Sequence, residues 1–147
     1  MNRRKRRGLN AKISDLAKFC TMHLWGEELN VPISVNYKHK DYLGMFVPNR
    51  LIELSSEVVK NEYALVDTLL HELCHWYCYE TGLDYDDDEQ DFIDEVENTG
   101  CTLTGDTTFK GGEYVKYIGS SEYREFEPSD KMITILKSYK ESTMVTN

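Results

Sequence analysis

Two histidines four residues apart, His71 and His75, constrain this chain more than any other feature of its sequence. Apolar residues recur around them at helical spacing, which predicts a helix over residues 62–81 that begins after Asn61. Residues four apart lie one turn above each other on one face of such a helix. Two imidazoles placed in this way can hold one metal ion, and Glu72 can then reach a water beside that ion. The stretch therefore predicts a metal-binding helix that carries a candidate catalytic base.

Residues 71–75 read His-Glu-Leu-Cys-His, the H-E-x-x-H signature of the zincin metalloproteases. A helix with two ordinary histidines is the competing interpretation. The chain has only 4 histidines, and two of them stand in this frame, which disfavours that interpretation. Catalytic zinc usually takes three protein ligands and keeps a fourth position for water. No histidine follows His75, so we expect the third ligand to be a carboxylate.

Carboxylates are dense in the segment that follows the motif, which leaves several candidates for the third ligand. They are Asp84, Asp86, Asp87, Asp88, Glu89, Asp91, Asp94, Glu95 and Glu97. Glu95 follows His75 at the spacing of the thermolysin-type gluzincins, in which a helical glutamate completes the site. Several of these charges also suit the start of a helix near residue 89, where carboxylates favour the positive end of the helix dipole. An EF-hand calcium loop is disfavoured because Glu89 stands where that loop needs glycine.

The composition indicates one globular domain in a reducing compartment. The chain has 147 residues, 40% of them hydrophobic, and no apolar run that would span a membrane. Its basic N-terminus lacks the apolar region of a signal peptide. None of the 4 cysteines forms a C-x-x-C pair, which favours buried free thiols. We therefore expect a cytoplasmic monomer without membrane contact, with association with the nucleoid as a further option.

A cluster of positive charge opens a chain whose net charge is −9. Its members are Arg3, Arg4, Lys5, Arg6 and Arg7. We expect residues 1–10 to form a disordered basic arm that neutralises nucleic-acid phosphates; a solvated tail without a ligand is the alternative. Residues 11–147 would then form a single metalloprotease domain, with its core at about residues 13–101 and a C-terminal extension over residues 102–147.

The order of the predicted elements indicates an α+β fold. A helix at about residues 13–29 precedes three short strands, the motif helix and a second helix at about residues 89–99. A small twisted sheet would pack on the motif helix, and the second helix would complete the metal site. Beyond Cys101 the signal weakens, with a strand expected near residues 114–118 and a helix or strand near residues 133–139.

Three stretches of the chain, residues 44–48, 51–55 and 69–75, resemble the SprT-like (Spartan-type) metalloproteases. Gly82, Tyr85, Asp91, Phe92 and Gly100 match the same family at their relative spacing. The resemblance covers about residues 13–101. It implies a minimal zincin domain with bound zinc and, in the better-known members, activity on proteins crosslinked to DNA.

Two departures from the family bear on the site. The family places a third histidine where Asp87 stands, or Asp88 after a shift of one residue, and the resemblance favours Asp87 as the third ligand over Glu95. An aspartate binds zinc at about the same distance as a histidine nitrogen, but it is harder and negatively charged. Many bacterial members end in a four-cysteine zinc ribbon, whereas residues 102–147 contain no cysteine.

These observations together predict a zinc-dependent endopeptidase in which Glu72 takes a proton from water and later passes it to the leaving amine. Its substrates would be proteins, with DNA-associated or DNA-crosslinked proteins as an option. One alternative is an ImmA-type regulatory metalloprotease acting on a repressor, which would favour Glu95 as a ligand. Another is a non-catalytic, zinc-stabilised DNA-binding or scaffold protein, in which Glu72 would have no use. Asp67, one turn before His71, is either a partner of that histidine or a surface carboxylate.

Overall fold

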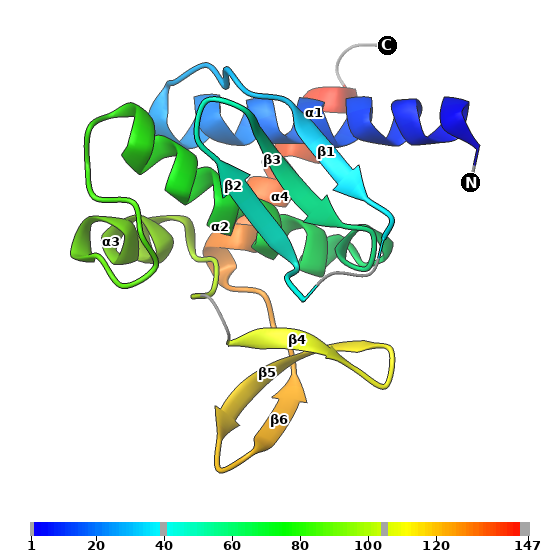
Figure 1. Ribbon diagram of the computed structural model, residues 1–147, viewed down its shortest axis with the longest axis vertical. Coiled ribbons are helices and arrows are strands. Elements are labelled where there is room, and N and C mark those ends of the chain that lie inside the picture. Colours follow the sequence, from blue (N-terminus) through cyan, green and yellow to red (C-terminus); the bar gives the residue numbers. More distant parts are fainter. Residues whose placement is uncertain (1, 39–40, 104–105, 145–147) are drawn as a thin grey trace.

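A computed structural model describes residues 2–38, 41–103 and 106–144 of the chain. These residues form four α-helices, one short 3-10 helix and two three-stranded sheets, so the predicted α+β class is confirmed (Figure 1). Among them, no helix is long and apolar enough to cross a membrane.

The motif helix α2, Glu62–Glu80, is the most buried helix and runs between the other elements of the body. It begins where the sequence predicts, because the side chain of Asn61 accepts hydrogen bonds from the backbone N–H groups of Tyr63 and Ala64, both at 3.0 Å. Glu80 is the last helical residue, Thr81 is the C-terminal cap, and Gly82 follows with a φ of 77°. The sequence prediction for this helix is therefore accurate to about one residue.

Helix α1, Arg3–Trp25, begins earlier than predicted. Residues 3–10, expected as a disordered arm, are helical, which corrects that expectation. Asn2 caps the helix by accepting a hydrogen bond from the Lys5 N–H at 2.9 Å. Arginine and lysine are strong helix formers, and adding a turn to an existing helix needs no new nucleation. The helical conformation of the buried part of α1 therefore continues through the basic residues at its N-terminus.

The first sheet consists of β1 (Ile33–Asn36), β2 (Gly44–Val47) and β3 (Leu51–Ser55) in the order β1-β3-β2. The central strand β3 is parallel to β1 and antiparallel to β2. After β3, the 3-10 helix η1 (Val58–Lys60) leads into α2. Strand β2 lies at the edge of the sheet beside α2, which leaves its outer edge next to the motif.

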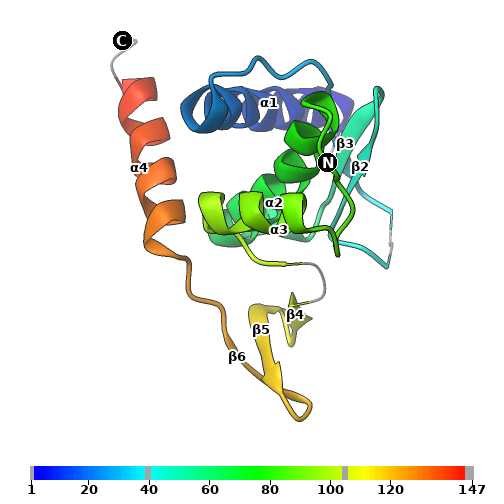
Figure 2. The same cartoon turned by 90° about the vertical axis from the view of Figure 1, so that its left-hand side faces the viewer.

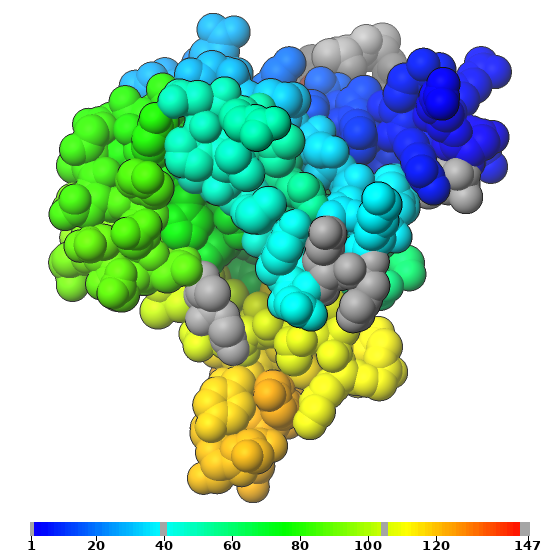
Figure 3. Space-filling view, in the orientation of Figure 1, coloured from blue at the N-terminus to red at the C-terminus, as the bar shows by residue number. Residues whose placement is uncertain are grey.

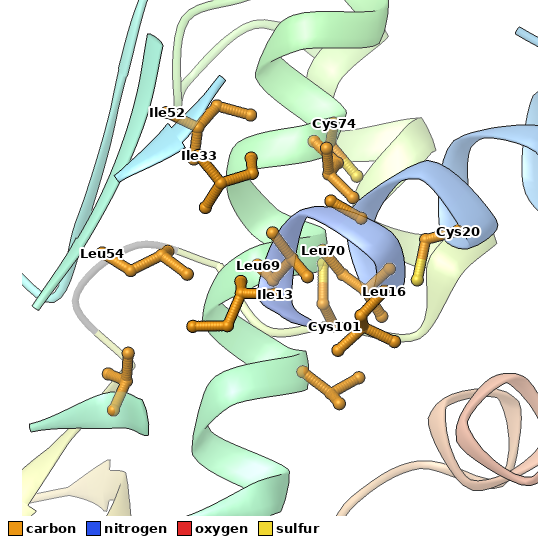
Figure 4. Close-up of a cluster of buried hydrophobic side chains, with 14 of the residues drawn as sticks. Ile13, Leu16, Cys20, Ile33, Ile52, Leu54, Leu69, Leu70, Cys74 and Cys101 are labelled. Carbon is orange, nitrogen blue, oxygen red and sulfur yellow. The ribbon is translucent and has the colours of Figure 1, made fainter. Parts of the chain in front are cut away.

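The main core lies between α1, α2 and the first sheet (Figure 4). Helix α1 contributes Ile13, Leu16 and Cys20, the sheet contributes Ile33, Ile52 and Leu54, and α2 contributes Leu69, Leu70 and Cys74. All four cysteines of the chain are free and buried, as the composition suggested. This packing fixes the position of α2, and with it the direction in which its polar face points.

Helix α3, Gln90–Thr99, follows a loop and ends at Gly100, which has a φ of 82°. The second sheet then projects from the body (Figures 1 and 2). It is antiparallel throughout, with the order β4-β5-β6, and its strands are β4 (Thr107–Lys110), β5 (Glu113–Gly119) and β6 (Glu122–Glu125). The predicted strand at residues 114–118 lies within β5, whereas β4 and β6 are not apparent from the sequence.

Helix α4, Asp130–Met144, returns from the second sheet to the body. It packs against α1, where the rings of Tyr139 and Phe19 meet edge to face with centroids 5.4 Å apart. The segment at residues 133–139, predicted as either helix or strand, is therefore helical. Because α4 closes onto α1, the second sheet is tethered to the body at both of its ends.

Candidate metal centre

The polar face of α2 presents His71 and His75 to a loop that joins α2 to α3 and carries Asp87. The Oδ1 atom of Asp87 lies 2.9 Å from Nε2 of His75 and 3.4 Å from Nε2 of His71. One ligand atom from each of these three side chains lies within 4.8 Å of the others, so the group could hold a metal ion. The structure thus brings together the three side chains that the sequence analysis names as metal ligands.

Backbone carbonyls orient both imidazole rings. Nδ1 of His71 lies 2.8 Å from the carbonyl oxygen of Thr102, and Nδ1 of His75 is hydrogen-bonded to the carbonyl oxygen of Tyr85. A protonated Nδ1 donates to the carbonyl in each case, which turns Nε2 toward Asp87. Phe92 supports both rings. Its ring stacks on that of His75, with centroids 3.9 Å apart, and meets the ring of His71 edge to face, with centroids 5.1 Å apart.

The two histidines differ in their electrostatic surroundings. Burial alone would lower the pKa of His71, yet the Asp87 carboxylate, the charge of Glu72 and the Thr102 carbonyl together raise it to about 9. Burial lowers the pKa of His75, and the neighbouring charge of His71 acts in the same direction. In the absence of a metal ion, His71 is therefore the more basic of the two rings and takes up a second ring proton more readily than His75.

The donor set at this site fits a divalent cation. A neutral His75 that donates its Nδ1 proton to Tyr85 turns the lone pair of Nε2 toward the Asp87 oxygen, 2.9 Å away. Two electron-pair donors at that distance repel each other unless a proton or a cation lies between them. Two imidazole nitrogens and one carboxylate oxygen are also the kinds of ligand that catalytic zinc sites use.

Glu72 is buried beside the two histidines, with a side chain packed near the first residue of β2. A Cβ built on Gly44 would lie 3.1 Å from Oε2 of Glu72 and 2.8 Å from Cγ2 of Thr68. Burial raises the pKa of the Glu72 carboxyl to about 7; the positive charge on His71 opposes this rise, and the Asp87 charge adds to it. The carboxyl is therefore poised to exchange a proton near neutral pH.

Asp67 is a buried carboxylate, which corrects the alternative that it lies on the surface, and its hydrogen bonds to Thr102 connect it to His71. One of its oxygens accepts the Thr102 N–H at 2.8 Å, and the other accepts the Thr102 hydroxyl at 2.7 Å. That second oxygen also accepts the hydroxyl of Tyr114 at 2.7 Å. Burial raises the pKa of Asp67, while the hydrogen bonds from Thr102 and Tyr114 lower it.

The site opens into a cleft of about 1350 Å³. Its walls come from β2, from the polar face of α2, from the loop that carries Asp87 and from the start of the second sheet, including Thr107 and Phe109. In Figure 3 the surface is hollowed where the cyan, green and yellow parts of the chain meet. The volume of the cleft exceeds the roughly 300–1,000 Å³ of a typical small-molecule pocket.

Among the described residues, the other candidate ligands do not join this group. Oε2 of Glu95 accepts the indole N–H of Trp25 at 2.8 Å, so this carboxylate faces α1 rather than the histidines. Trp25 in turn stacks on Tyr77 with ring centroids 4.5 Å apart. Asp88 lines the cleft, but among the described residues it does not join the ligand group.

The basic residues at positions 3–7 lie on the exposed first turns of α1, remote in sequence from the metal centre. The guanidinium of Arg6 lies 4.4 Å above the ring of Tyr37, a residue that lines the cleft. Arg6 thus contacts a residue that lines the cleft, and the basic residues belong to a helix instead of a disordered arm.

Sequence reasoning missed the residues that orient the histidines. Thr102 and Tyr85 act through backbone carbonyls, which every residue possesses, so their side chains carry no signal for this role. Tyr114 belongs to a strand whose position relative to α2 depends on the tertiary fold. The spacing of the motif could identify the ligands, but it could not identify what holds them in place.

The fold and the site define a protein with a His-Glu-x-x-His helix, a carboxylate-bearing loop and a sheet edge beside them. Residues 10–105 of the chain match the SprT-like family. The chain therefore belongs to the SprT-like family, as the resemblance of its motifs implied. No curated protein and no solved structure shows a match to it.

Proposed function

We propose that this chain is a zinc-dependent endopeptidase in which His71, His75 and Asp87 hold the ion and Glu72 is the general base. Membership of the SprT-like family supports a metallopeptidase-type function. The observation that carries the proposal is the convergence of the three ligand atoms within 4.8 Å, beside a buried glutamate and in an open cleft.

When bound, the metal ion would polarise the scissile carbonyl and acidify the attacking water. Glu72 would accept the proton of that water and pass it to the leaving amine, a role that a pKa of about 7 suits at neutral pH. Asp87 adds a negative charge that a third histidine would not, which shifts the preference of the site toward harder cations. The cleft walls would orient the chain to be cut.

The shape of the site favours an extended segment of a protein as substrate. Strand β2 is an edge strand, and Gly44 at its start lies against Glu72. An extended peptide can add to such an edge through backbone hydrogen bonds that are largely independent of sequence. We therefore propose substrates that are proteins with locally unfolded segments, rather than one defined peptide.

The test of the catalytic role is Glu72→Gln. The amide is of similar size but cannot accept the proton of water, so we expect cleavage of a denatured protein substrate to fall by about 100-fold or more, while bound zinc is retained. Glu80→Gln, an exposed change on the same helix, is the matched control and should cleave normally. Cleavage by Glu72→Gln at the wild-type rate would exclude Glu72 as the base.

The test of the ligand set is the metal content of purified variants. Asp87→Ala should lower the zinc bound per chain, because it removes one of the three ligands. Glu95→Ala should keep its zinc, since its carboxylate binds Trp25. The opposite result would favour the gluzincin arrangement and, with it, the ImmA-type alternative.

Two alternatives, a regulatory protease of a different ligand arrangement and a non-catalytic protein, receive less support. An ImmA-type regulator of a repressor would use Glu95 as a metal ligand, yet this side chain faces α1. A non-catalytic, zinc-stabilised scaffold would have no use for Glu72, whose burial beside the histidines costs free energy whenever the carboxyl is ionised. The first observation favours Asp87 over Glu95 as the third ligand, and the second favours catalysis.

A second function, association with DNA, is proposed from the basic end of α1. Arg3, Arg4, Lys5, Arg6 and Arg7 are exposed there, and the contact of Arg6 with Tyr37 brings this end next to the cleft. Such a cluster binds phosphates without regard to sequence. DNA held there would bring DNA-associated or DNA-crosslinked proteins close to the cleft, and would place the chain at the nucleoid.

The test of this second function is a salt titration of binding to single-stranded DNA. Neutralising up to five phosphates gives a log–log slope of at most about −3.5, and replacing the five basic residues with glutamine should abolish binding. Lys18→Gln, an exposed change farther along α1, is the control. Absence of binding by the wild type at low salt would remove DNA from the proposal, and unchanged binding by the five-residue variant would place the contact elsewhere.

A further inference from the structure

The second sheet reaches the motif helix through Tyr114, a buried residue of β5. Its ring packs between Phe109 and Phe126, with centroids 5.2 and 4.9 Å away, and these three aromatic residues attach the sheet to the body. The Tyr114 hydroxyl points out of this cluster and donates to Oδ2 of Asp67 on α2 at 2.7 Å. The hydroxyl oxygen of Tyr114 also lies 2.7 Å from Oγ1 of Thr107, and this second contact helps to fix the direction of the Tyr114 hydroxyl.

A continuous chain of hydrogen bonds leads from this hydroxyl to the metal centre. Asp67 accepts the Tyr114 hydroxyl and binds both the N–H and the hydroxyl of Thr102, at 2.8 and 2.7 Å. The carbonyl of Thr102 in turn lies 2.8 Å from Nδ1 of His71. Each link is within ordinary hydrogen-bond distance. The links run from β5 to α2, from α2 to the segment after α3, and from that segment back to α2.

The burial of Asp67 makes this chain rigid. Its side chain is almost fully excluded from water, at 1% exposure, so its carboxylate depends on the donors that surround it. Three donors meet it: one peptide N–H and two hydroxyls. Together they hold the side chain of Thr102 and the peptide unit before it, and the carbonyl of Thr102, on the following peptide unit, meets the His71 ring. A metal-ligating histidine needs this kind of fixed partner on its other nitrogen.

We propose that Tyr114, Asp67 and Thr102 are positioning residues for His71, so that the second sheet is part of the support of the metal site. The inference rests on the proposed function, because it takes His71 as a metal ligand. It adds to that function a residue outside the part of the chain that matches the family, since Tyr114 lies beyond residues 10–105. The sheet therefore does more than form one wall of the cleft.

The experiment compares Tyr114→Phe with Tyr117→Phe, an exposed change on the same strand. The first variant removes only the hydroxyl that Asp67 accepts. We expect its zinc dissociation constant, measured by competition with a chromophoric chelator, to rise by about 10- to 100-fold, and that of Tyr117→Phe to stay at the wild-type value. Thr102→Val, which lacks the hydroxyl, should weaken zinc binding in the same way. Thr102→Ser, which keeps the hydroxyl, should bind zinc as the wild type does.

A role confined to folding would lower the unfolding temperature of Tyr114→Phe and leave its zinc dissociation constant unchanged, and that outcome would overturn the proposal. Nitrogen-15 NMR of the His71 ring in the metal-free protein provides a readout that needs neither zinc nor activity. The Nδ1 proton should exchange slowly in the wild type and faster in Tyr114→Phe; equal exchange rates would also overturn the proposal. A wild type that binds no zinc, yet shows this difference, would contradict the proposed function and retain the positioning chain.

Discussion

At the scale of single residues, Glu72 shows how the fold changes the chemistry of a side chain. Its carboxyl group is buried next to two imidazoles, and burial raises its pKa to about 7 from a reference value of 4.5. Between these two values the unfolded chain ionises while the folded protein keeps its proton. Folding of the metal-free protein therefore loses stability at this residue as the pH rises from about 4.5 to 7.

We predict that Glu72→Gln reveals this cost. Glutamine cannot ionise, so the metal-free variant should gain free energy of unfolding relative to the metal-free wild type as the pH rises, by up to about 3 kcal/mol at pH 8. Urea unfolding at pH 4.5 and pH 8 measures the difference, and the exposed Glu80→Gln is the control for loss of a negative charge. A difference between Glu72→Gln and wild type that stays constant with pH would show that the folded state does not raise this pKa.

At the scale of elements, the contact between β2 and α2 determines how close the sheet edge comes to the site. Gly44 begins β2, and a Cβ at this position would lie 2.8 Å from Cγ2 of Thr68 and 3.1 Å from the Glu72 side chain, so these side chains of α2 would have to shift. Glycine is therefore required here for close approach rather than for an unusual backbone angle. The same contact sets the distance between a peptide added to β2 and the proposed base.

We predict that Gly44→Ala lowers peptidase activity by about 10- to 100-fold while zinc remains bound, because the added methyl displaces Glu72 or moves β2 away from α2. The Thr68→Ser change removes the methyl group nearest to the new side chain, so the double variant should recover part of the activity. Gly8→Ala is the control, since nothing lies within 4 Å of a Cβ at that position. Full activity of Gly44→Ala would show that Glu72 does not need this contact.

At the scale of the whole molecule, the metal centre links the buried motif helix to an exposed residue of the loop that follows it. His71 and His75 belong to the buried helix α2, whereas Asp87 lies on an exposed loop before α3. The loop is rich in carboxylates that repel one another, and in the absence of a metal ion the charges of its neighbours raise the pKa of Glu89. A bound cation would therefore tie the loop to the body and reduce the repulsion within it.

We predict that metal removal destabilises the whole domain. Zinc at a free concentration of 1,000 times its dissociation constant stabilises the folded state by about 4 kcal/mol, so chelation should lower the unfolding temperature by roughly 10 °C. Calorimetry with and without a chelator measures this change, and added zinc should reverse it. Asp87→Ala should respond far less. An identical unfolding temperature of the wild type in both conditions would contradict metal binding by the folded protein.

Local spacing in the sequence was sufficient for the parts of the protein that depend on neighbouring residues. The positions of His71, Glu72 and His75 follow from the period of the helix, and Asn61 marks its start because capping is a local interaction. The α+β class follows from the order of the elements. Residues 3–10 were misjudged because their charge suggested disorder, whereas the helix that starts in the core simply continues through them.

Only the tertiary structure could decide between Asp87 and Glu95 as the carboxylate that faces the histidines, because both lie at plausible distances along the chain. Helix α1 decides it by supplying Trp25 as the partner of Glu95. The Thr102 carbonyl and the Tyr114 hydroxyl likewise reach His71 and Asp67 from distant parts of the chain. Such contacts depend on how the elements pack, and a backbone carbonyl is present at every residue. The sequence by itself determined the two histidines and the glutamate between them, and the packing of α1, the loop and the second sheet determined what surrounds them.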